Sequence, residues 1–308
     1  MFAAFITTIF FSLSAIFASR SSRILGVAVA NLGRMTGATL MLAIWAHTFG
    51  QGLRGASLPW FLVSGFIGYG LGDVALFQAF TRIGPRLTMM LVHCLAVPIA
   101  AVIENIWLGT SLRPAEIVCA CVILGGVCIA LTPVRHLNLR RNLLWSGVFF
   151  GACAGFGQGF SAVISRKAYA VAVSTGLHID GGTAGYQRIL GGIVVAAGFM
   201  VLTKGLRWNV DVVHEAQALV HNPQLKSRAW MFVALNGLAG PVLGVACFQW
   251  ALSMSPSGIV LPILAVTPVV TIPLTYLIDG DRPSMRSMVG GVIAVGGTVA
   301  LALAKASH

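Results

Sequence analysis

The sequence predicts an all-α integral membrane protein with ten transmembrane helices, arranged as two inverted repeats of five. The first observation is composition: of 308 residues, 57% are hydrophobic and only 9% are charged. Soluble domains carry roughly 25% charged residues, so this chain lacks the polar surface that water requires. The second observation is a series of long apolar runs. The third is an internal repeat.

Each apolar run is long enough to cross a bilayer as a helix, which takes about 20 residues. Backbone groups in lipid must pair within the segment, and these runs lack the alternation of barrel strands, so helices are expected. The predicted spans are 2–19, 24–48, 57–80, 86–107, 114–132, 143–165, 183–203, 229–252, 257–278 and 286–304.

The two halves of the chain repeat one another when the sequence is shifted by 171 positions. The matching pairs are Phe77-Gln78 with Phe248-Gln249, Pro85 with Pro256, Gly109 with Gly280, and Gly125-Gly126 with Gly296-Gly297. Smaller shifts align Ser14 with Ser161 and Arg34 with Arg188. We therefore predict a first repeat over 1–137 and a second over 138–308. Because five spans is an odd number, the second repeat enters the membrane from the opposite side.

Small residues recur every four positions on two of the predicted spans. Gly147, Gly151, Gly155 and Gly159 mark the sixth span, and Ser64, Gly68 and Gly72 mark the third. Such faces let helices approach closely in lipid, so we interpret them as packing surfaces. The glycine run at 68–72 has no strand before it, which excludes a dinucleotide loop.

Several functional classes are disfavoured by what the sequence lacks. There is no Walker A, HExxH or GxSxG motif, so no catalytic residue is assigned. The six cysteines form no CxxC pair and lie in apolar runs, so neither a metal site, a cofactor nor a disulfide is predicted. The net charge of +12 comes from Lys and Arg spread over short connections, which excludes a nucleic-acid surface.

Three ionisable residues are expected at similar depth inside the membrane. Arg34 lies in the second span, Asp73 in the third and His93 in the fourth, within roughly 5 Å of one another along the normal. An Arg34–Asp73 pair serves either as a structural lock or as a site for proton coupling or a substrate carboxylate. At the positions that correspond to Asp73 and His93, the second half carries Gly244 and Leu264. These ionisable side chains therefore belong to the first half alone.

Other polar residues of the spans are candidates for a polar pore. Arg188 has no carboxylate at the matching place, and it either attracts an anionic group or snorkels to the interface. The remaining candidates either line the pore or bond across helices: Gln78, Gln249, Gln158 and Tyr69. Pro98, Pro262 and Pro268 break helical hydrogen bonds and are hinge candidates, with a static kink as the alternative.

Several of these features resemble the EamA-type transporters of the drug/metabolite transporter superfamily. They are the five-plus-five repeat, an Arg in each second span (Arg34, Arg188), a Pro in each fourth span (Pro98, Pro268), and the stretch Ile278-Asp-Gly-Asp-Arg282 before the glycine-rich last span. The first half departs from the pattern, because Gly109-Thr-Ser111 lacks the acidic residue. The resemblance implies cytoplasmic termini, whereas most Lys and Arg lie in the odd connections, which predicts external termini.

The resulting expectation is a secondary transporter, an exporter of small metabolites such as amino acids, working by alternating access between two inverted repeats. The expected partners are a small-molecule substrate, a proton as coupling ion and the lipid bilayer, without nucleic acid. We expect a multi-pass protein of the bacterial inner membrane, as a monomer or homodimer. The alternatives are a membrane enzyme acting on lipid-linked substrates and a non-transporting membrane scaffold.

Overall fold

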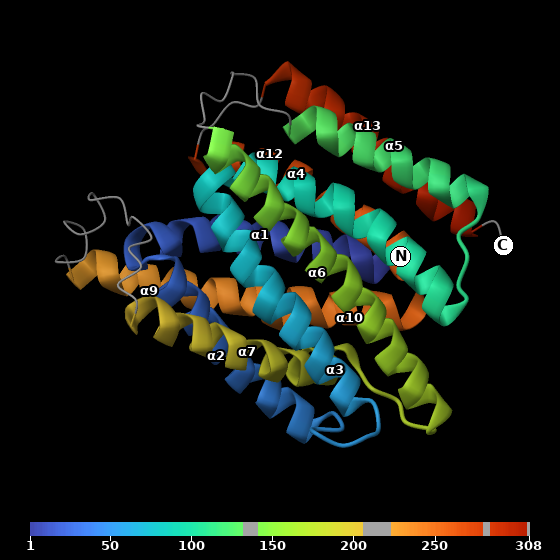
Figure 1. The fold of residues 1–308 in the computed structure, drawn as a ribbon, viewed down its shortest axis with the longest axis horizontal. Coiled ribbons are helices and arrows are strands. Elements are labelled where there is room, and N and C mark those ends of the chain that lie inside the picture. The colour runs from blue at the N-terminus through green and yellow to red at the C-terminus, as the bar shows by residue number, and fades with distance from the viewer. Residues whose placement is uncertain (132–140, 206–222, 280–283, 307–308) are drawn as a thin grey trace.

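The computed structural model describes residues 1–131, 141–205, 223–279 and 284–306, and these are helical almost throughout (Figure 1). The first half contains α1 (Phe2–Leu25), α2 (Val27–Thr48), α3 (Leu58–Gly65), the π-helix η1 (Phe66–Gly72), α4 (Asp73–Leu108) and α5 (Pro114–Leu131). The second half contains α6 (Arg141–Ser174), α7 (Gly181–Gly205), α9 (Pro223–Gly237), the π-helix η2 (Leu238–Gly244), α10 (Val245–Met254), α11 (Ser257–Leu264), α12 (Thr267–Asp279) and α13 (Met285–Ala306).

Among the described residues, eight helical stretches are long and apolar enough to cross a membrane. They are Leu58–Leu76, Thr88–Leu108, Pro114–Leu131, Arg141–Ser174, Gly181–Val201, Ser227–Met254, Ser257–Leu274 and Met285–Ala304. The first two predicted spans are the helices α1, whose apolar part is the shorter stretch Phe2–Ala18, and α2. The prediction of an all-helical membrane protein is confirmed.

Three predicted boundaries differ from the structure. The third and fourth spans are joined, because α4 stays helical through the connection and its ribbon bends sharply there (Figure 1). Helical bonds thus satisfy backbone groups that an open loop would leave to water. The sixth span extends to Ser174, since the charge of Arg166, which ended the prediction, is paired. The ninth span is split into α11 and α12 by a turn at Ala265-Val266.

The helices of the two halves pack in a reciprocal pattern. The first helix of each half packs against the segments that form the third span of the other half. These contacts are α1 against α9, η2 and α10, and α6 against α3 and η1. Equivalent helices also pack directly, α2 against α7 and α5 against α13, the latter pair side by side at one edge in Figure 1. This exchange is what a two-fold relation between the halves requires.

The predicted glycine faces are packing surfaces. Added Cβ atoms on the stripe Gly147, Gly151, Gly155 and Gly159 of α6 would meet α4 at every one of the four positions. Glycine also allows close packing of α5 on α13, because a Cβ on Gly126 of α5 would lie 2.5 Å from the Ala294 nitrogen of α13. Gly26 alone separates α1 from α2, and its φ of +80° lies in the region that favours glycine.

Candidate functional site

Each half carries a π-helical segment at the same place in its third span. Residue 66 corresponds to 238 and residue 72 to 244, a shift of 172 at both ends. A π-segment widens one helical turn and is found frequently at functional sites. The two segments lie next to reciprocal serine contacts: Ser14 Oγ donates to Asn236 Oδ1 at 2.6 Å, and Ser64 Oγ donates to the Ser161 carbonyl at 2.6 Å. Each π-segment therefore lies beside a serine hydrogen bond that joins the two halves.

Arg188 of α7 lies in the centre of the protein against η1. Its residue is only 4% exposed, and its guanidinium carbon lies 5.2 Å from the Tyr69 ring centroid and 5.9 Å from that of Phe248. Gly68 makes room for it, because a Cβ there would lie 3.2 Å from Arg188 Nη2. The backbone of Arg188 also abuts Gly65, where a Cβ would collide with its carbonyl group.

The charge of Arg188 has no carboxylate partner at ion-pair distance within the described residues. Its buried Nε has no hydrogen-bond partner there either. A guanidinium presents five N–H donors, and a buried charge is costly unless paired. The two aromatic faces compensate part of this cost through cation–π attraction. The arrangement leaves a buried positive group able to bind an anion.

Arg34 and Asp73 form the predicted ion pair. Arg34 Nη2 lies 3.2 Å from Asp73 Oδ2, with side chains 16% and 19% exposed, and Arg34 Nε donates to Asn31 Oδ1 at 2.7 Å. Asp73 is the first residue after η1, so the π-segment separates this pair from Arg188. Tyr69 interacts electrostatically with Arg188, Asp73 and Arg34, which places the four groups in one central polar cluster.

Gln249 and Tyr169 are among the other side chains with buried polar atoms that lack a partner in the described part of the chain. Gln249 of α10 is 0% exposed, and neither its amide nitrogen nor its oxygen has a hydrogen-bond partner within the described residues. The buried hydroxyl group of Tyr169 in α6 likewise has no hydrogen-bond partner within the described residues, and Tyr169 also interacts electrostatically with Arg188. Because unsatisfied buried polar atoms are rare in native proteins, they point to a ligand or water that occupies the site.

For three other predicted site residues, the described interactions are local to one helix or absent: Gln78, Gln158 and His93. No described interaction joins His93 to Arg34 or Asp73, and its buried Nε2 has no partner in the described region. Gln78 Oε1 accepts from Arg82 Nη1 one helical turn away, at 2.5 Å. Gln158 is half-buried, and its backbone carbonyl accepts from Ser161.

The three hinge candidates differ in their surroundings. The helix α4 continues through the exposed Pro98 as far as Leu108. Pro262 lies within α11 and Pro268 in the first turn of α12, on either side of the turn at Ala265-Val266. A hinge role for each of them stays a prediction. Most of the Ile278–Arg282 motif falls outside the described residues.

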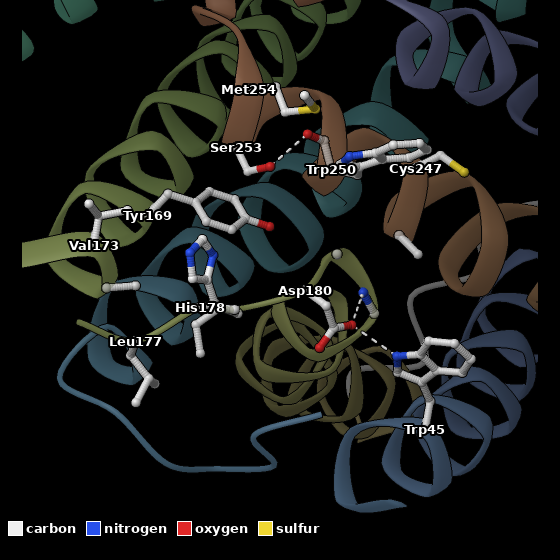
Figure 2. A pocket seen from close by; sticks show the side chains of 15 residues that line it. Trp45, Tyr169, Val173, Leu177, His178, Asp180, Cys247, Trp250, Ser253 and Met254 are labelled. Carbon is white, nitrogen blue, oxygen red and sulfur yellow. Dashed lines mark hydrogen bonds between the residues drawn. The ribbon is translucent and has the colours of Figure 1, made fainter. Parts of the chain in front are cut away.

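A cavity of about 630 Å³ opens between α2, α6, α7 and α10, and Figure 2 shows its side chains. We call it the Asp180 pocket. Asp180 precedes α7, where its Oδ1 accepts from the Gly182 and Thr183 backbone N–H groups and from Trp45 Nε1, at 2.9–3.0 Å. Burial raises the pKa of Asp180, but these bonds and one from the Thr183 hydroxyl group outweigh it and hold the pKa below its ordinary value. Tyr169 lines the pocket.

Sequence reasoning missed an ion-pair network that joins the two halves. Glu104 of α4 is 1% exposed, and its Oε1 accepts from Arg166 Nε of α6 at 3.0 Å. Its Oε2 accepts from the Ser257 backbone N–H group at 2.6 Å and from the Ser257 hydroxyl group. Arg166 also donates to the Leu252 carbonyl at 2.8 Å. The available signal was that Glu104 and Arg166 end the fourth and sixth spans, which finish on the same side.

The cysteines contain one close pair. Cys94 Sγ of α4 lies 3.2 Å from Cys128 Sγ of α5, and the two are thiols that form no disulfide with each other. The sequence did not indicate this contact, because the two residues lie in different spans without any spacing motif.

Comparison with known proteins places these features in context. The EamA-like transporter family matches residues 1–132 and 145–303, which is nearly the whole chain. No curated protein matches it. Among solved structures, one titled "Crystal structure of protein" superposes with a TM-score of 0.73 at 17% identity, covering 98% of this chain and 97% of the other. At that identity the likeness shows the fold alone.

Proposed function

Because this chain belongs to the EamA-like transporter family, whose members are transporters and not enzymes, we propose that it is a secondary exporter of small metabolites such as amino acids. Membership of this family implies membrane transport and excludes the alternative of a membrane enzyme. The substrate, the direction of transport and the coupling ion are the proposed parts. We also propose the bacterial inner membrane as its location.

The observation that carries the substrate class is the buried Arg188. A guanidinium binds a carboxylate through charge-assisted, often bidentate hydrogen bonds, which are stronger than neutral ones. Arg188 offers an Nε that has no hydrogen-bond partner among the residues described, and Tyr69 and Phe248 provide aromatic surfaces on which an apolar substrate body can pack. Gln249 adds an unsatisfied donor and acceptor in the buried core of the second half. A small amphipathic carboxylate suits this set of groups.

The Arg34–Asp73 pair is the proposed coupling site. Asp73 is the carboxylate in direct contact with Arg34, and it is linked electrostatically to Arg188 through the same cluster. Protonation of Asp73 would release Arg34, so proton binding and substrate binding can influence each other across η1. We propose that alternating access moves the halves about the two-fold relation, with the break between α11 and α12 as one flexible point.

An efflux assay tests the function. Liposomes containing the purified protein are loaded with an equimolar mixture of the amino acids, and the external buffer is analysed by mass spectrometry with and without an imposed pH gradient. We expect selective efflux of one or a few amino acids above protein-free liposomes, and faster efflux with the gradient. Efflux equal to that of protein-free liposomes for every amino acid would refute the proposed substrate class.

Two variants connect the assay to the residues. Arg188→Gln keeps hydrogen-bonding capacity but removes the charge, and efflux should fall at least tenfold. The matched control is Arg54→Gln, because Arg54 is exposed in the connection between α2 and α3, and efflux should be unchanged. Asp73→Asn should retain exchange and lose its dependence on the pH gradient.

A further inference from the structure

The Asp180 pocket is built differently from the central cluster. Figure 2 shows Tyr169 of α6, Trp45 of α2, Trp250 of α10 and Asp180 arranged around one cavity. Among its described lining residues, Asp180 carries the only formal charge when His178 is neutral. The whole chain has a net charge of +12, so an acidic aromatic pocket is an exception within it. Its chemistry selects a cation.

The carboxylate of Asp180 retains capacity for a ligand. Its Oδ1 already accepts three N–H groups, from Trp45, Gly182 and Thr183. Within the described residues, its Oδ2 accepts one bond, from the Thr183 hydroxyl group at 2.5 Å. A carboxylate offers about four lone-pair sites, and Asp180 is exposed to the cavity. Oδ2 can therefore accept an N–H group from a cation in the pocket.

The aromatic residues supply the second half of a cation site. Trp faces attract cations most strongly among the aromatic side chains. The Trp45 ring is fixed by its bond to Asp180 at 2.9 Å, and Trp250 lies on the α10 side of the pocket. Tyr169 is only 6% exposed, and its hydroxyl group lacks a hydrogen-bond partner among the described residues. That hydroxyl group is an independent sign that the pocket is built for a polar ligand.

We propose that the Asp180 pocket binds the ammonium group of a small organic amine, with Asp180 as its counter-charge and Trp45, Trp250 and Tyr169 as its walls. The apolar part of the amine packs against Leu177 and Met254. Tyr169 is shared with the central cluster, because it lines this pocket and also interacts electrostatically with Arg188, which selects the opposite charge. Binding here is an equilibrium property that does not require transport, so it can fail while the proposed function holds, and the reverse.

Fluorescence titration of the purified protein in a zwitterion-free detergent tests the site, because Trp45 and Trp250 line the pocket. The probe is 2-phenylethylammonium, and the comparison ligand is 3-phenylpropionate, which has an aromatic body and a carboxylate in place of the ammonium group. We expect saturable quenching by the amine and none by the acid. Equal quenching by the two ligands would overturn the proposal.

Charge is separated from folding by the substitution Asp180→Asn. Asn caps helices about as well as Asp, so α7 should keep its N-terminus while the pocket loses its charge. We expect the dissociation constant of the amine to rise at least tenfold. The matched control is Glu116→Gln, which neutralises a carboxylate that also bonds a backbone N–H group at a helix start, that of Arg113 at 2.8 Å, outside the pocket. The affinity of the amine for the Glu116→Gln protein should equal its affinity for the natural chain.

A second variant covers the case in which Asp180→Asn fails to fold. Trp250→Leu removes an aromatic wall and leaves the helix cap intact, and it should weaken the amine at least threefold. Unchanged affinity in a folded Asp180→Asn protein, or in Trp250→Leu when the first variant is unfolded, would overturn the site.

Ammonium groups also come from lipid headgroups, and vesicles distinguish the two sources. The titration is repeated in phosphatidylglycerol vesicles with and without phosphatidylethanolamine. Equal affinities support a free amine as the occupant. Weaker binding in the presence of phosphatidylethanolamine overturns the free amine as the natural occupant and assigns the pocket to the headgroup.

Discussion

Substitution of Glu104 by Ala should destabilise the protein more than any other single carboxylate change in the described part of the chain. The variant removes the partner of Arg166 Nε and of the Ser257 backbone N–H group. Removing one member of a buried ion pair costs about 3–5 kcal/mol. Because the Arg166 side chain is 21% exposed and can recruit water, we expect about 3 kcal/mol, the lower end of that range.

The assay is thermal unfolding of the purified protein in detergent. A loss of about 3 kcal/mol corresponds to a Tm lower by roughly 5 °C for a chain of this size. Glu116→Ala is the control, because it loses only the bond from the Arg113 N–H group, and it should lower the Tm much less. The double variant Glu104→Ala/Arg166→Met should recover part of the loss, since no unpaired charge remains. A Glu104→Ala Tm within 2 °C of the Glu116→Ala value, or a double variant no more stable than the single, would refute the reasoning.

Three further predictions concern packing, the central cluster and a helix cap. Gly126→Ala should lower stability by about 1–3 kcal/mol, because its Cβ would crowd the backbone of α13, whereas Gly125→Ala, with open space around its Cβ, should be neutral in the same thermal assay. Gly68→Ala should reduce efflux severalfold, because its Cβ would lie 2.6 Å from Ser161 Oγ and 3.2 Å from Arg188 Nη2, so that the side chains around the guanidinium must shift, and unchanged efflux would contradict that placement. Asp180→Ala should cost about 0.5–2 kcal/mol at pH 7. Because the pKa of Asp180 is lowered on folding, this stabilisation is present above the unfolded-state pKa near 3.9 and is lost as the pH falls through the folded value, so the Tm difference should shrink in acid.

The spans and their repetition were predictable because the bilayer imposes length and apolarity on every crossing helix. The Arg34–Asp73 pair was predictable for a related reason: counting residues from span ends fixes depth, and depth leaves few partners for a buried charge. The same counting gives only the depth of His93, whose role stays a prediction, since depth does not determine which way a helix face points. Rotation about the helix axis decides that, and it depends on packing against neighbouring helices.

Other parts of the site depend on features that one sequence does not display. Glycines of the π-segments η1 and η2 pack against α6, α7 and α1, and neither segment has a distinct local sequence signal. The Glu104–Arg166–Ser257 network joins three spans from both halves, so it required knowledge of which helices are neighbours. The absence of a carboxylate at the position equivalent to Asp73 was visible in the repeat, because the shift of 171 places Gly244 there and the shift of 172 between the π-segments places Val245 there. What the structure added is that Arg188 is buried between aromatic rings.

The measurement that tests the central claim most directly compares an acid with its amide. The amino acid that leaves fastest in the efflux assay and the corresponding amino acid amide are each added to purified protein, and the rise in Tm is recorded for the natural chain and for Arg188→Gln. A ligand that binds only the folded state raises the Tm, and at equal concentration the ligand that binds more tightly raises it more. We predict that the acid stabilises the natural chain well above the amide, and that Arg188→Gln abolishes this preference. Equal stabilisation by acid and amide, or a preference that survives in folded Arg188→Gln, would contradict the assignment of Arg188 as the group that binds the substrate anion.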